Sequence, residues 1–265
     1  MVLSELFDPL FRLALIDGLL LAAVLPVLGA VLMLRDEWLA ALGFAHLAAA
    51  GALLGLAFGL PAVAGGVAAA GAAAIAKGAG GGQGNAVYGF MILGGWAALL
   101  LIGANTEVGE QLGRALIDGQ LYFAGPADLI AAALLGGMTA LILPWLMPRL
   151  LRARLLPQHD AANGYPVRRW QLGFDLLAAA GMAIGTASMG LMAAFALVLV
   201  PAWIAFRSAP SWRWTLAGSA ALGVVGYLVS FAAALALDQP FGPMLVAVLL
   251  VLAGGYAAVA RGPAA

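Results

Sequence analysis

The sequence predicts an all-α, polytopic membrane protein with eight or nine transmembrane helices. The chain of 265 residues is 65% hydrophobic and only 9% charged, whereas charged residues make up about 25% of a soluble domain. Long apolar runs recur throughout, and about 20 apolar residues suffice for a helix to cross the hydrocarbon core. These runs are too long for barrel strands, and open sheet edges are not stable in lipid. We therefore expect a single transmembrane domain over residues 1–265.

Each apolar run in turn is interpreted as one span. The third run is short and rich in glycine, so eight spans with one re-entrant piece is the alternative to nine. Prolines fall inside three of the runs, where they remove a helical hydrogen bond and favour a kink. The expected spans are residues 13–34, 39–60, 62–77, 86–104, 127–147, 170–187, 191–206, 214–236 and 241–260.

The connection over residues 149–169 sets the orientation, because it carries five of the chain's twelve basic residues. Short loops rich in Lys and Arg stay on the cytoplasmic side of a membrane. Counting spans from this loop places the N-terminus outside and the C-terminus in the cytoplasm. It leaves only Arg12 and Arg114 outside. We expect a multi-pass protein of the inner (plasma) membrane.

Two other connections are polar. Residues 78–85 are rich in glycine and predict a flexible turn on the cytoplasmic side. Residues 105–126 mix apolar and polar side chains and fall outside. They predict either a short surface or re-entrant helix ending at Pro126, or an ordinary interfacial loop.

Several kinds of chemistry are missing from the sequence. Without cysteine, disulfides and thiol chemistry are excluded. A phosphate-binding loop needs G-K-[ST], but the one lysine, Lys77, is followed by a single glycine and then Ala79. Neither G-x-S-x-G nor H-E-x-x-H occurs, and the net charge is zero. We therefore expect neither an enzyme nor a nucleic-acid-binding protein.

Three ionisable residues fall inside predicted spans, where they are costly and are functional candidates. His46 fits either a transition-metal ligand or a neutral histidine bonded to a backbone carbonyl, and the pattern alone leaves both open. Asp17 and Asp175 are interpreted as structural, because they fall near predicted helix starts, where a carboxylate suits the helix dipole.

Five segments, in order, match a known family. Arg35 is followed by A-L-G-F-A-H-L-A-A-A-G; then come L-I-D-G-Q-L-Y-F-A-G-P-A-D-L, D-A-A-N-G-Y-P-V, G-L-M-A-A-F-A-L-V-L-V-P-A and D-Q-P-F-G-P. On these segments the chain resembles the membrane-spanning permease of bacterial ABC importers for zinc, manganese and iron. The resemblance covers nearly the whole length.

The resemblance implies partners and sites. Two permease copies would form a homodimer, two cytoplasmic ATPases would hydrolyse ATP, and a periplasmic or surface metal-binding protein would deliver the cargo. It implies no permanently bound cofactor, only a transported divalent metal. The residues implied are His46 as metal ligand, Asp160, Ala161, Ala162 and Gly164 for coupling to the ATPase, and Pro201, Asp238, Gly242 and Pro243 for the pathway or its gating.

One position departs from the family pattern. The family's site pairs the histidine with an aspartate four residues earlier, on the same helix face; here that position is Leu42. The same machinery carrying a metal chelate or another small solute is therefore the alternative. A stand-alone channel or secondary transporter would show buried charge pairs within the spans, and the sequence shows few.

Overall fold

The structure, a computed structural model, describes residues 11–80, 84–106, 109, 116, 119 and 121–260. Within this part, every helix of 18 residues or more is apolar enough to cross a membrane, and no strand occurs. The helices are α2 (Arg12–Leu34), α3 (Leu39–Ala57), α4 (Ala62–Gly80), α5 (Asn85–Asn105), α7 (Pro126–Leu155), α9 (Val167–Met189), α10 (Leu191–Ser208), α11 (Trp212–Leu237) and α12 (Phe241–Ala260). The predicted fold class is confirmed, and the third span is a full helix of 19 residues.

The helices differ in how much of their surface is buried inside the protomer. In α2, α3, α9 and α10 most of the apolar window is buried inside the protomer, whereas α12 buries 11% of it. The helices α3, α4 and α5 pack as one group, which α9 joins to the rest through its contacts with α3 and α4. The exposed apolar faces suit lipid or a second subunit.

Close helix approach depends on glycine. A Cβ on Gly51 of α3 would lie 2.5 Å from the Gly65 carbonyl oxygen of α4, and a Cβ on Gly65 would lie 2.3 Å from the Gly51 oxygen. Only residues without side chains allow this backbone-to-backbone contact, which is how helices gain van der Waals packing in lipid.

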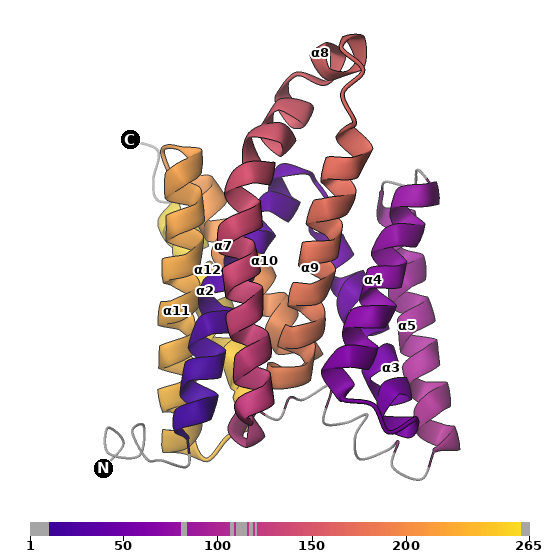
Figure 1. Cartoon of the computed structure of the whole chain (residues 1–265). Coiled ribbons are helices and arrows are strands. Elements are labelled where there is room, and N and C mark those ends of the chain that lie inside the picture. The colour runs from indigo at the N-terminus through magenta and orange to yellow at the C-terminus, as the bar shows by residue number, and fades with distance from the viewer. Residues whose placement is uncertain are drawn as a thin grey trace.

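The connection predicted to be cytoplasmic projects beyond the other helices. Helix α7 continues to Leu155, eight residues past its predicted end, and a short helix, α8 (Pro157–Ala162), caps the projection before α9 returns (Figure 1). The predicted end at 147 was wrong because R-L-L-R-A-R-L, although polar, consists of strong helix formers. We call the face that carries α8 the α8 face.

The other polar connection is described only in part. Half of the residues in the expected surface or re-entrant helix over 105–126 lie outside the described ones. A 3-10 turn, η1 (Leu121–Phe123), precedes α7, and its Tyr122 ring meets Phe231 edge-on at a centroid distance of 5.7 Å. This contact ties η1 to α11 at the face opposite α8.

Candidate functional site

His46 lies buried in the α8-face half of α3. Its side chain faces Trp96 of α5, with 5.9 Å between the ring centroids, and the residue is 4% exposed. Its Nδ1 lies 2.9 Å from the Leu42 carbonyl oxygen. A carbonyl only accepts, so Nδ1 carries the hydrogen and Nε2 of the neutral ring keeps its lone pair. The ring is thus oriented by its own helix, and Nε2 can accept a proton or a metal ion.

His46 has no nearby cluster of ligands. Among the described residues, no group of three or more His, Cys, Asp or Glu is placed to hold a metal ion. The position one turn before it, which shares its helix face, is the apolar Leu42. The structure thus contains the bond to a backbone carbonyl, and that bond does not involve the second imidazole nitrogen, Nε2.

Helix α5 is pressed against α3 at this histidine. A Cβ added at Gly95 would lie 2.6 Å from the His46 carbonyl carbon and 2.7 Å from its Cβ. A side chain there would push the two helices apart, because real Cβ atoms do not approach so closely. Gly95 therefore sets the position of Trp96 next to the imidazole.

A ring of four charged side chains, which the sequence analysis did not predict, lies buried near the α8 face. Arg35 contacts Glu37 at 2.6 Å and Asp175 at 2.7 Å, and Lys77 contacts the same two carboxylates at 2.9 and 2.8 Å. Each side chain is at most 6% exposed. We call these residues the charge ring. Its two positive and two negative charges cancel, which removes most of the cost of burial.

The ring joins segments that are distant in the sequence. Arg35 ends α2, Glu37 lies in the link to α3, Lys77 is in the last turn of α4, and Asp175 is in α9. The Arg35 guanidinium also lies over the Phe174 ring, and the Lys77 ammonium over the Tyr88 ring. These cation–π contacts add to the stability of the desolvated cations.

The helix-dipole interpretation of the two aspartates was wrong. Neither lies in the first turn of its helix, because α2 begins at Arg12 and α9 at Val167. Asp175 belongs to the charge ring instead. Asp17 is fully buried and accepts a hydrogen bond of 2.7 Å from the Ser188 hydroxyl of α9.

The coupling residues implied by the resemblance divide into one buried and three exposed. Asp160 is 1% exposed, and its Oδ1 accepts a hydrogen bond of 2.7 Å from Arg152 Nε of α7. Arg152 in turn lies over the Tyr165 ring, 4.4 Å from its centroid. Asp160 thus holds α8 onto α7 from within. The residues that face outward are Ala161, Ala162 and Gly164.

Gly164 closes α8 in a left-handed conformation. Its φ is +62°, its N–H donates to the Ala161 carbonyl at 3.2 Å, and the Tyr165 N–H donates to the Asp160 carbonyl at 3.1 Å. This pair of bonds is the Schellman motif, which favours glycine at that position. The sequence D-A-A-N-G-Y therefore ends the helix at a defined place and leaves a small apolar tip exposed.

The pathway residues implied by the resemblance do not gather around His46. Pro201 is buried within α10. Asp238, with φ of +50°, ends α11, and Gly242 and Pro243 lie in the first turn of α12. That junction is at the face opposite α8, so these three residues are on the other half of the molecule from His46.

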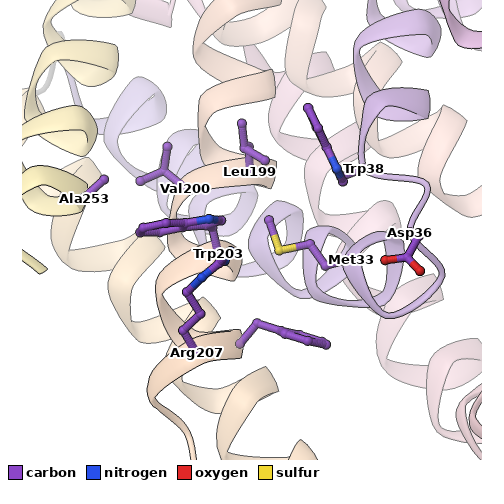
Figure 2. A pocket seen from close by; sticks show the side chains of 9 residues that line it. Met33, Asp36, Trp38, Leu199, Val200, Trp203, Arg207 and Ala253 are labelled. Atoms are coloured by element: carbon purple, nitrogen blue, oxygen red, sulfur yellow. The ribbon is translucent and has the colours of Figure 1, made fainter. Parts of the chain in front are cut away.

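A pocket of about 720 Å³ lies at the α8 face, between the end of α2, α10 and α12. Figure 2 shows the side chains that line it. Trp203 lies under the Arg207 guanidinium, 4.3 Å from the ring centroid, and the one carboxylate, Asp36, is paired with Arg154. Tryptophan with a basic residue is typical of the membrane–water boundary, and this pocket offers no metal site.

Known proteins support the fold and the family. The model of the ABC 3 transport family matches residues 8–257. The structure of PsaBC from Streptococcus pneumoniae in complex with Fab has a TM-score of 0.84 at 18% identity, covering 96% of this chain and 94% of that one. A structure described as an inward-facing, metal-chelate type ABC transporter has a TM-score of 0.77 at 16% identity, covering 97% and 88%. No curated protein sequence matches.

Proposed function

Because the chain belongs to the ABC 3 transport family, whose ATP hydrolysis is done by a partner subunit, we propose that it imports a divalent transition metal, zinc or manganese. It works as a homodimer with two ATPases. A periplasmic or surface binding protein delivers the metal to the face opposite α8. The chain supplies the pathway through the lipid, and the ATPases supply the energy.

The observation that carries the proposal is the geometry of α8. Its tip stands beyond the other helices (Figure 1) and exposes Ala161, Ala162 and Gly164, while Asp160 and Arg152 hold it rigidly from within. A protruding, preorganised helix with a small apolar tip is suited to insert into a groove of a partner. We assign the ATPase to this surface.

Charge supports a cytoplasmic α8 face. Among the described basic residues, only Arg12 belongs to the opposite face. The α8 face or the helix ends that lead to it carry Arg35, Lys77, Arg149, Arg152, Arg154, Arg168, Arg169, Arg207 and Arg213. This bias follows the positive-inside rule. We therefore place the start of α2 outside and the end of α12 in the cytoplasm.

At the centre of the pathway, His46 meets the metal with Nε2 while Leu42 supplies no charge. A site with one neutral ligand holds a divalent ion weakly, because nothing offsets the ion's desolvation. Weak binding suits a cargo that must leave. The same lack of charge favours a second candidate cargo, a metal chelate that brings its own ligands, and this is the alternative function.

The test is uptake by the reconstituted complex. Liposomes containing the chain and its ATPase, with the binding protein outside, are given radioactive Zn²⁺ or Mn²⁺, free or chelated. We expect ATP-dependent accumulation of the free ion. Accumulation only of the chelate selects the alternative, and uptake by the chain without an ATPase contradicts both.

A further inference from the structure

Resting on the proposed function, we propose that the charge ring of Arg35, Glu37, Lys77 and Asp175 is the positioning element that transmits movement of α8 to α3 and its His46. The ring touches no cargo. It makes α9, the helix that follows the coupling segment (residues 160–164), and α3, the helix that carries His46, move as one body.

One side of the ring is built into the start of α3. Glu37 lies two residues before the first residue of α3, and its carbonyl accepts a hydrogen bond of 2.9 Å from the Ala40 N–H. Its backbone is thus part of the first turn of the helix. A displacement of the Glu37 carboxylate displaces the first turn of α3. His46 lies about 10 Å further along the same rigid helix.

The other side of the ring is built into the helix that follows α8. Asp175 lies on α9, which begins at Val167 directly after the coupling segment. A helix is stiff over this distance, so α9 moves as a lever when the ATPase moves α8. Asp175 holds Arg35 and Lys77 through separate oxygens, Oδ1 and Oδ2, and so pulls on both α2 and α4.

A cavity separates the ring from the coupling segment. It measures about 180 Å³ and is lined on one side by Arg35 and Glu37 and on the other by Arg154 and Pro157. Close-packed interiors transmit displacement, so this space interrupts direct packing between the start of α8 and the ring. Arg154 bridges the gap by its ion pair with Asp36, the residue next to Arg35. Movement can therefore reach the ring by two routes.

Charge pairs transmit movement better than the surrounding apolar contacts do. The hydrophobic driving force is non-directional and ties no atom to a particular partner. Each cation of the ring contacts both anions, so no helix end can leave without breaking two short, charge-assisted contacts. The helix ends must shift together.

The proposal is tested by distances rather than by transport, so its outcome does not depend on the identity of the cargo. The chain has no cysteine, which allows spin labels at engineered sites. One label at the exposed Leu155, which ends α7 just before α8 and is outside the tip assigned to the ATPase, or at the exposed Leu54 of α3 is paired with one at the exposed Val251 of α12. Helix α12 packs on α10 and α11. Both distances are measured in the complex with its ATPase, without nucleotide and with Mg-ATP and vanadate.

Two double variants cut the ring while keeping its charge balanced. Glu37→Gln with Lys77→Met leaves the Arg35–Asp175 pair, and Asp175→Asn with Lys77→Met leaves the Arg35–Glu37 pair. We expect both distances to shift in the wild type. In either double variant the Leu155 distance shifts as before, while the shift at Leu54 is at least halved.

Ser219→Ala is the matched control, because Ser219 is fully buried but bonds only the Thr215 carbonyl of its own helix, α11. It should shift both distances as the wild type does. Equal shifts at Leu54 in the wild type and the ring variants would overturn the proposal. So would a wild type in which Leu155 moves and Leu54 does not, a result that needs no variant to assemble.

Discussion

Two regions of the protein treat buried polarity in opposite ways. At the charge ring, four ionised side chains neutralise one another within 3 Å. At His46, about 10 Å further along α3, one imidazole faces the Trp96 ring, and its Nδ1 is bonded to its own helix. The first arrangement fixes helix ends in place. The second leaves one nitrogen for an exchangeable partner.

The two regions therefore have different tasks: the charge ring fixes helix positions, and His46 is proposed to bind the transported metal. Breaking a buried ion pair is costly, because the remaining charge is left buried and unsolvated. A site that grips a metal in this way would not release it. We infer that the buried charged side chains position the helices at the α8 face, and that few protein ligands bind the cargo.

Removing one member of the ring should have the largest effect. Asp175→Ala leaves two buried cations with one anion, and we expect it to lower the free energy of unfolding by about 3–5 kcal/mol. Asp36→Ala breaks the Arg154 pair, whose side chains are 49% and 73% exposed, and should cost about 0–1 kcal/mol. SDS titration of the purified chain measures both. Equal losses would contradict the assignment of the ring as a buried structural unit.

The neighbouring glycines Gly94 and Gly95 test the packing at His46. Gly95→Ala forces a methyl group against the His46 backbone, and we expect a loss of about 1–3 kcal/mol and a change in Trp96 fluorescence. At Gly94 a Cβ would meet nothing within 4 Å, so Gly94→Ala should be neutral or slightly stabilising. If both variants behave alike, α5 does not approach α3 as described.

The left-handed glycines Gly164 and Gly59 test the coupling tip. Both have positive φ and room for a Cβ, so replacement by Ala costs each about 1–2 kcal/mol of backbone strain. Gly164 ends α8, whereas Gly59 follows α3 at the opposite face. We expect only Gly164→Ala to lower the cargo moved per ATP hydrolysed by the complex. A matching loss from Gly59→Ala would show general destabilisation instead.

The fold was readable in the sequence because lipid imposes one rule, a long apolar run for each span. The prediction of helix bounds was least accurate at the end of α7, where basic residues continue the helix into water. Hydropathy registers where the membrane ends, and the end of α7 lies beyond that point.

The charge ring was not predicted because three of its four contacts join residues 40, 98 and 140 positions apart. A signal existed: Arg35, Glu37 and Lys77 all fall at the predicted cytoplasmic ends of spans, and Asp175 falls five residues into another span from that side. Two charges of each sign at similar depth predict pairing. Buried charge pairs are typical of secondary transporters. Their presence in a member of the ABC 3 transport family shows that they do not distinguish secondary transporters from permeases of this family.

Sequence position also could not tell which coupling residues face outward. Asp160 matches the family segment as well as Ala161 does, yet it is buried because Arg152, one helix earlier, reaches it. At His46 the structure adds the bond from Nδ1 to the Leu42 carbonyl, and the role of His46 as a metal ligand stays a prediction.

The central claim, that cargo is met at His46 by few protein ligands, is tested most directly by Zn²⁺ or Mn²⁺ titration of the purified complex. Leu42→Asp places a carboxylate on the same face of α3, one turn before the imidazole. We expect it to raise the affinity roughly tenfold or more, and His46→Ala to abolish that gain while leaving assembly intact. If Leu42→Asp binds no more metal and His46→Ala transports as the wild type does, His46 is structural and the cargo passes elsewhere.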